Sequence, residues 1–124
     1  MQLTQHQTQG ELFVRRADAQ SVLVVDRSFT RSLVLFADHA WEDFPAREVG
    51  ELDNALIDKI LEQQPEVVLL GTGSRAIFPA PAVLAQFLKR GVGLETMDNA
   101  AAARTFNVLA GELRRVAAVF LLPG

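Results

Sequence analysis

The chain has 124 residues, of which 49% are hydrophobic and 22% are charged, a composition typical of one globular domain rather than of a disordered protein. Its formal net charge of −3 argues against a nucleic-acid partner. The absence of cysteine excludes disulfides and thiolate metal sites and fits a reducing cytosol, so we expect a cytoplasmic protein. The strongest apolar run, 116–122, is far shorter than the roughly 20 residues of a membrane-spanning helix, which predicts no transmembrane segment.

The first third of the chain has the pattern of short strands. Residues 1–10 are polar and lack the features of a targeting peptide, so we expect a flexible lead-in before a single α/β domain at 11–124. Apolar runs at 22–25 and 33–36, separated by a turn-like segment at 26–28, predict an antiparallel meander. Trp41 lies in an irregular segment; it either pins this loop to the core or offers an exposed aromatic contact.

The second half alternates helical and strand patterns. A helix that connects two strands of one sheet forms a crossover, and a crossover of this kind makes the two strands parallel. We therefore predict an α/β fold in three layers, with a central mixed sheet, an antiparallel N-terminal meander and a βαβαβ C-terminal half. The predicted order is helix 52–64, strand 67–70, a helix that starts near Pro79 and Pro81 and ends at Gly91, strand 92–95, helix 100–110 and strand 116–122. The predicted buried face of the middle helix consists of Val83, Leu84, Phe87 and Leu88.

A candidate site follows from this topology. The loops after strands 67–70 and 92–95 should lie side by side at one edge of the sheet, where open α/β sheets bind ligands. Backbone N–H groups of a glycine-containing turn could hold an anion there. The turn contributes Gly71, Thr72, Gly73, Ser74 and Arg75, and Glu95 and Asp98 face it.

Other interpretations of these residues stay open. The turn lacks the complete pattern of a dinucleotide or phosphate loop, so its glycines can serve turn geometry alone. Glu95 can instead be an ion-pair partner of Arg75 or Arg104. The helix 100–110 is apolar around most of its circumference, and its polar stripe of Arg104 and Asn107 either points inward toward partners or faces solvent.

The sequence offers little catalytic machinery. Two histidines without metal-ligand spacing predict no metal site, and Ser74 lacks the surroundings of a nucleophile elbow. General acid–base chemistry would fall to Glu95 or Asp98. The sequence thus favours a non-enzymatic protein, without a cofactor, over an enzyme.

Three segments resemble a small family of unknown function. They are Leu69–Gly73 with the prolines that follow it, Gly91–Asp98, and Ala101–Leu109. The eukaryotic members of that family include a mitochondrial assembly factor for respiratory complex I and an adipogenesis-associated Mth938-domain protein, and its bacterial members are mostly uncharacterised. The similarity is carried by the back half, roughly Pro65 to Pro123. Phe106 stands where many relatives have tyrosine.

The resemblance implies a three-layer domain with a central mixed sheet and no established enzyme activity. It also implies that the strand-end turn clusters with Glu95, Met97, Arg104, Thr105 and Asn107. Two functional hypotheses result. The first is a binding or assembly module that acts through a protein partner, such as a subunit or assembly factor of a membrane complex. The second is a protein, possibly catalytic, that binds a small anion between Gly71–Arg75 and Glu95–Asn107.

Overall fold

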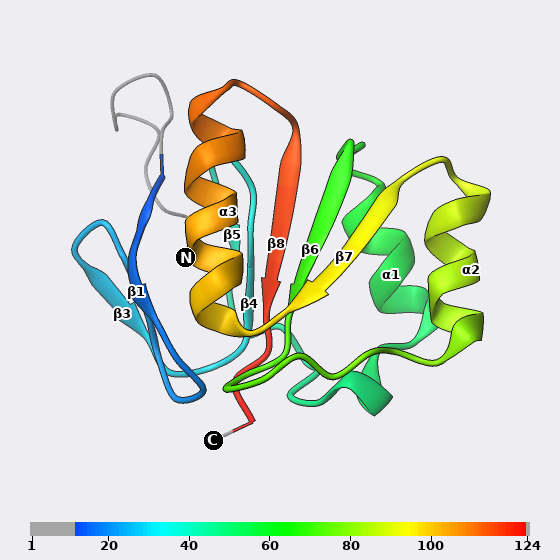
Figure 1. Ribbon diagram of the computed structural model, residues 1–124, viewed down its shortest axis with the longest axis horizontal. Coiled ribbons are helices and arrows are strands. Elements are labelled where there is room, and N and C mark those ends of the chain that lie inside the picture. Colours follow the sequence, from blue (N-terminus) through cyan, green and yellow to red (C-terminus); the bar gives the residue numbers. More distant parts are fainter. Residues whose placement is uncertain (1–11, 124) are drawn as a thin grey trace.

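The computed structural model describes residues 12–123, shown in Figure 1. The expected lead-in at 1–10 lies outside the described residues. The elements are β1 (Val14–Ala17), β2 (Val22–Val24), β3 (Arg27–Phe29), β4 (Leu33–Leu35), β5 (Ala40–Trp41), a 3-10 turn (Val49–Glu51), α1 (Asn54–Leu61), β6 (Val67–Gly71), α2 (Pro81–Lys89), β7 (Gly93–Met97), α3 (Asn99–Gly111) and β8 (Val116–Phe120).

The central sheet is mixed, as the sequence predicts. Its five strands follow the order β5-β4-β8-β6-β7. β6 is parallel to both β7 and β8, whereas β4 is antiparallel to β8 and to β5. The register places Gly71, at the end of β6, beside Met97 of β7 and Phe120 of β8. The carboxyl ends of these three strands therefore meet at one edge of the sheet.

The N-terminal meander forms a separate antiparallel sheet of β1, β2 and β3. The predicted pairing of the runs 22–25 and 33–36 is wrong, because β4 (Leu33–Leu35) pairs with β5 and β8 in the central sheet. The expected turn at 26–28 is wrong in its placement: the chain turns at Val25 and Asp26, and Arg27 and Ser28 already belong to β3. Val25 takes a positive φ of 54°, so the reversal needs only two residues. Because Val25 is apolar, the sequence pattern assigns it to the strand and does not indicate a turn at this position.

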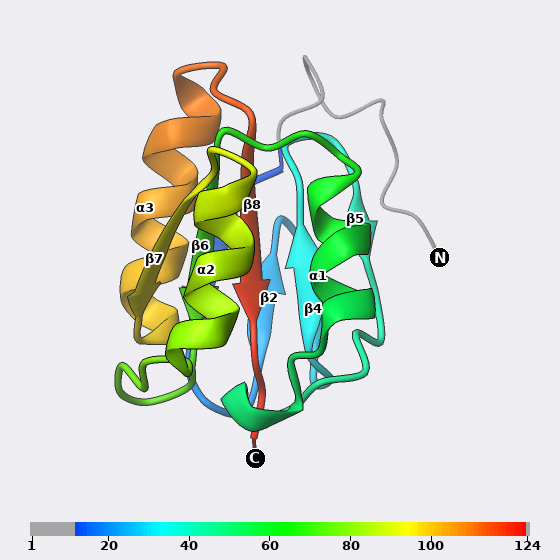
Figure 2. The same cartoon turned by 90° about the vertical axis from the view of Figure 1, so that its right-hand side faces the viewer.

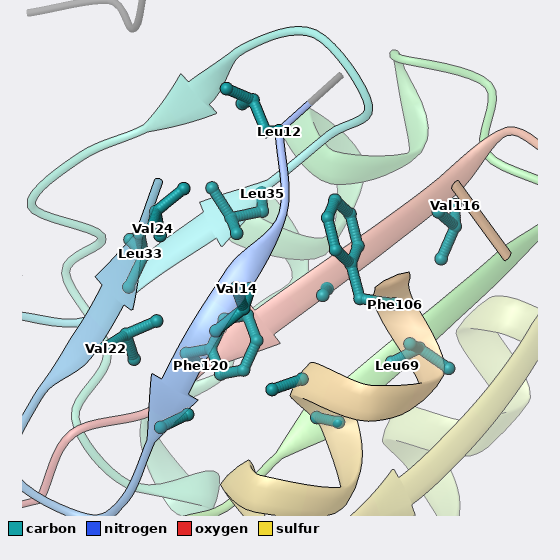
Figure 3. Packing of buried hydrophobic residues seen from close by; sticks show 14 of the residues in the cluster. Leu12, Val14, Val22, Val24, Leu33, Leu35, Leu69, Phe106, Val116 and Phe120 are labelled. Carbon is teal, nitrogen blue, oxygen red and sulfur yellow. The ribbon is translucent and has the colours of Figure 1, made fainter. Parts of the chain in front are cut away.

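Three layers result from this arrangement. α1 and α2 cover one face of the central sheet, while α3 and the three-stranded sheet cover the other (Figures 1 and 2). Each face has its own apolar cluster. Phe106 of α3 packs with Leu69, Phe120 and the strands of the small sheet (Figure 3), and Phe87 of α2 packs with Ile57 and Ile60 of α1 in the second cluster. The buried strands β6 and β8 contribute side chains to both clusters, which explains why they are apolar throughout.

The helix ends follow local chemistry. The Asp53 carboxylate accepts a hydrogen bond from the Leu56 N–H at 2.9 Å and caps α1, and Asp98 caps α3 through the Ala101 N–H at 2.7 Å. Pro81 occupies the first turn of α2, where its missing N–H has no helical partner to lose. Trp41 is pinned to the core by an edge-on contact with Phe44, with ring centroids 4.9 Å apart.

One predicted helix face is wrong. Phe87 is buried and Val83 is partly buried, but Leu84 is 40% exposed and Leu88 is 64% exposed. α2 lies beside β7, the last strand of the central sheet (Figure 1). Because no further strand extends beneath it, only one side of the helix meets the sheet, and its second apolar row faces outward.

Candidate functional site

The turn that follows β6 is closed by hydrogen bonds to β7 and to its own backbone. The Thr72 N–H donates to the Met97 carbonyl at 3.0 Å, and the Asn99 N–H donates to the Gly73 carbonyl at 2.8 Å. The two loops therefore lie side by side, as the topology predicts. The Thr72 hydroxyl donates to the Arg75 carbonyl at 2.6 Å and accepts from the Ile77 N–H at 2.9 Å. These bonds hold the turn in one shape.

Asn99 occupies the centre of the turn, and sequence reasoning did not select it as a site residue. Its side chain is fully buried. Its Oδ1 accepts from the Gly73 N–H at 3.2 Å, and its Nδ2 donates to the carbonyls of Leu121 at 3.0 Å and Asp18 at 2.9 Å. One amide thus joins the β6 turn, the segment after β8 and the β1–β2 turn. The sequence signal for it is the Asp98-Asn99 pair at the start of a helix, where either side chain is suited to cap the helix.

The two glycines of the turn are required for different geometric reasons. Gly73 has a φ of +103°, which a residue with a Cβ rarely adopts. Gly71 has ordinary dihedrals, but a Cβ there would collide with Asn99 Oδ1 and lie 3.1 Å from the Val119 carbonyl oxygen. Glycine at 71 therefore makes room for the amide of Asn99. Ser74 and Arg75 project from the turn as exposed residues.

The remaining predicted residues lie at different places around this edge. Asp98 caps α3. Met97 packs against the cluster beneath α3. Glu95 is exposed in the edge strand β7 and, within residues 12–123, forms no ion pair. The expected pairs of Glu95 with Arg75 or Arg104 do not form in this structure.

The polar stripe of α3 separates into two environments. Asn107 accepts from the Val14 N–H at 2.8 Å and donates to the Val14 carbonyl at 2.9 Å, so its amide pairs with β1 as a neighbouring strand would. This pair of hydrogen bonds joins α3 to the small sheet. Arg104 is exposed and has no hydrogen-bond or ion-pair partner among the described residues. Thr105 is half-buried on the same helix.

Two hollows open at the same edge of the molecule. The larger, about 520 Å³, is lined by the β1–β2 turn, the β3–β4 connection, the segment 43–47 and Leu122. The smaller, about 210 Å³, is lined by Thr72 and Ile77 from the β6 turn together with Leu121, Pro123 and the 3-10 turn. Arg47 lines both hollows and donates to the Pro123 carbonyl at 3.0 Å. A third hollow of about 410 Å³ lies at the opposite end of the sheet, beside His39 and Arg115.

Local hydrogen bonds lower the pKa of the Asp18 and Glu42 carboxyl groups. The N–H groups of Gln20 and Ser21 lower the pKa of the Asp18 carboxyl. A two-pronged hydrogen bond from Arg27, with N–O distances of 2.9 and 3.0 Å, lowers the pKa of Glu42. Lowered values keep carboxylates charged near neutral pH, unlike a general base or acid poised for catalysis. Residues 12–123 hold no group of three or more side chains suited to a metal ion.

A set of large apolar side chains is exposed over one part of the surface. Ile77 and Phe78 lie in the loop before α2, and Leu84 and Leu88 lie one turn apart on its outer side. Phe78 is 75% exposed. We call these four residues the α2 surface. Its side chains come from one continuous stretch of chain, unlike the other exposed apolar residues Phe13, Val108 and Leu113.

The fold and this edge define a three-layer α/β protein with an anchored strand-end turn. The chain belongs to the family described as "Protein of unknown function (DUF498/DUF598)", which matches residues 14–121. A solved structure from Xanthomonas campestris shares 45% identity and a TM-score of 0.84, covering 91% of this chain and 86% of that one. A Bordetella pertussis structure called an Mth938-like domain shares 25% identity and a TM-score of 0.77, covering 93% and 88%. The resemblance drawn from the sequence is thereby confirmed.

Two relatives have names that suggest different settings. The "NADH dehydrogenase [ubiquinone] 1 alpha subcomplex assembly factor 3" of Danio rerio is 44% identical over 64 residues, which are 52% of this chain and 36% of that protein. The chain thus matches about a third of that assembly factor. The "13 kDa major membrane protein" of Francisella tularensis is 24% identical over 98% of this chain and 99% of its own. Among the described residues, no helix has the length and apolar character needed to cross a membrane.

Proposed function

We propose that this protein is a binding module that acts through a protein partner and does not catalyse a reaction. The observation that supports it is the α2 surface of Ile77, Phe78, Leu84 and Leu88, four large apolar side chains exposed along one stretch of chain. Exposed apolar groups that form a patch are typical of interaction sites, and these four lie in the one stretch 77–88. Burying one leucine or phenylalanine side chain contributes about 1.5–3 kcal/mol, so such a set can anchor a partner.

The folding of α2 does not require these side chains. Phe87 is 3% exposed and, with the partly buried Val83, holds the helix on the sheet. Leu84 and Leu88 lie on the outer side of α2 and belong to neither apolar cluster. The exposed part of each side chain contributes no packing energy to the folded chain, and a partner that covers it would explain its presence.

Similarity to complex I assembly factors is consistent with this proposal. An assembly factor holds an incomplete complex through protein contacts, and a domain with an apolar surface and little catalytic machinery suits that task. We therefore propose an assembly-type role, in which the α2 surface covers a matching apolar surface of a client protein. We also propose a cytoplasmic location, tested by separating soluble and membrane fractions of the native cell and probing each for the protein.

A pull-down with matched variants tests the proposed function. Three tagged proteins are expressed in the native cell, cross-linked chemically and then captured. They are the wild type, the double variant Leu84→Glu/Leu88→Glu, and the control Val108→Glu, which changes an exposed apolar residue on α3. We expect a protein recovered in near-stoichiometric amount with the wild type and the control but not with the α2 variant. Equal recovery by both variants, or none by the wild type under several growth conditions, would refute it. All three proteins should unfold at similar temperatures, because both sites are exposed.

A second candidate function is the binding of a small anion between Gly71–Arg75 and Glu95–Asn107. The exposed Arg75 and Arg104, whose side chains have no hydrogen-bond or ion-pair partner among residues 12–123, favour it. A ligand that binds there raises the melting temperature by mass action. The test is a thermal-shift screen of nucleotides, phosphates and carboxylates. The candidate fails if stabilising compounds act equally on Arg75→Ala and Arg104→Ala.

A further inference from the structure

The hollow of about 520 Å³ shares no lining residue with the α2 surface. Its wall comes from parts of the chain that are far apart in sequence: the β1–β2 turn, the β3–β4 connection, the segment 43–47 and the residue Leu122 after β8. In Figure 1 the β1–β2 turn and the C-terminal end both lie at the lower edge. Its volume falls within the roughly 300–1,000 Å³ of small-molecule pockets. We call it the seam pocket.

The seam pocket carries an excess of positive charge. Arg31 and Arg47 line it, and the carboxylate among its lining residues is that of Asp43. The Arg31–Asp43 pair is long, at 3.7 Å, with both side chains more than two-thirds exposed at 79% and 67%. Exposed pairs of this kind contribute little to stability, so the Arg31 guanidinium is available to a stronger anionic partner.

Arg47 is held in position before any ligand arrives. Its backbone N–H donates to the Glu51 carboxylate at 2.7 Å, and its guanidinium donates to the Pro123 carbonyl at 3.0 Å. Since a guanidinium has five N–H donors, most remain for another acceptor. A fixed guanidinium loses little conformational entropy on binding.

Ser32 supplies a buried donor to the same pocket. The residue is 1% exposed and is part of the pocket wall. Its hydroxyl oxygen accepts from the Leu122 N–H at 2.9 Å, and its carbonyl accepts from the Phe44 N–H at 2.8 Å. Within residues 12–123 the hydroxyl proton has no acceptor. The bond from Leu122 satisfies the Oγ atom as an acceptor and leaves its proton for a ligand oxygen placed beside it in the pocket.

We propose that the seam pocket binds a small organic anion with a carboxylate or phosphate group and an apolar part. The anionic group accepts hydrogen bonds from Arg31, Arg47 and the Ser32 hydroxyl. The apolar part packs against Pro45, which is exposed and lines the pocket. This site is independent of the protein-binding role proposed above, since it uses none of the residues of the α2 surface.

The test measures binding of three probes to the whole chain by ¹H–¹⁵N NMR titration and thermal shift. Hexanoate and phenyl phosphate present the two anionic groups, and hexanamide is the neutral control. We expect saturable binding of at least one anion, with the largest shifts at the amides of Ser32 and Leu122, and no saturation by hexanamide. Preference between the two anions identifies the group that the site favours.

Three variants locate the site. Arg31→Gln and Arg47→Gln should each weaken binding about tenfold, while Arg90→Gln, which gives up an exposed ion pair with Asp58 outside the pocket, should bind as the wild type does. Arg47→Gln also loses its bond to Pro123, so Arg31→Gln, which gives up only a weak ion pair, is the decisive variant. The proposal is overturned if no anion saturates at 10 mM, roughly the weak limit of specific binding. It is equally overturned if hexanamide binds as well as hexanoate, or if Arg31→Gln and Arg90→Gln bind alike.

Discussion

Replacing Asn99 by alanine should destabilise the protein far more than the size of the side chain suggests. The change removes three hydrogen bonds from a fully buried amide. The bonds to the Gly73 N–H and the Leu121 carbonyl are themselves buried, so both groups lose their partner away from water. Each such group costs about 1–3 kcal/mol. The Asp18 carbonyl belongs to an exposed residue and can turn to solvent.

Together the two buried groups predict a loss of about 4 kcal/mol in the free energy of unfolding, within a range of about 2–6 kcal/mol. This is a large fraction of the roughly 5–15 kcal/mol available to a domain. For a chain of this length it corresponds to a fall of about 15 °C in melting temperature. Alanine has a better helix propensity than asparagine, but by less than about 0.7 kcal/mol, which does not offset the loss.

The assay is urea unfolding followed by circular dichroism and by the fluorescence of Trp41, the single tryptophan. Asn107→Ala is the matched control, because that amide also bridges α3 to distant backbone but is half-buried. Water can replace its bonds, so we expect a loss of about 1 kcal/mol. The free energy of unfolding should fall with urea concentration at the same slope in both variants as in the wild type. A loss below about 1 kcal/mol for Asn99→Ala, or equal losses for the two variants, would refute the role assigned to Asn99.

Three further predictions follow from the same contacts. Gly71→Ala should lower the free energy of unfolding by about 2–4 kcal/mol, because the added methyl group displaces the Asn99 amide. The loss should be smaller when Asn99 is already alanine; if the two losses in urea unfolding simply add, the two side chains do not compete for the same space. Asp98→Ala should cost about 1 kcal/mol by removing the cap of α3, and an unchanged melting curve would exclude this cap as a stabilising contact. Glu42→Gln should cost about 1 kcal/mol at pH 7, because its bond from Arg27 lowers the pKa of the folded carboxyl. That stability is present above the pKa of the unfolded chain and is lost as pH falls through the lower folded value, so the two unfolding curves should converge below about pH 4; a constant difference down to pH 2 would disprove the electrostatic origin.

Local chemistry in the sequence determined much of this fold. Pro81 near the start of α2 and Gly91 after its end bound that helix because their backbones favour those positions, and Gly91 indeed has a φ of +71°. The uniformly apolar β6 and β8 are strands buried on both faces, which requires side chains of that kind wherever both faces are covered. Parallel pairing of β6 with β7 followed from the helix between them.

Tertiary structure alone decided which apolar and polar side chains are used for packing. Leu84 and Leu88 have the helical spacing of core residues, and they are exposed only because the sheet ends at β7. Asn99 resembles a helix cap at a solvent-facing end, and it is buried because three distant segments meet around it. The seam pocket likewise joins residues that the sequence separates by up to about a hundred positions. A sequence pattern reports periodicity along one element, whereas burial depends on what lies across from it in space.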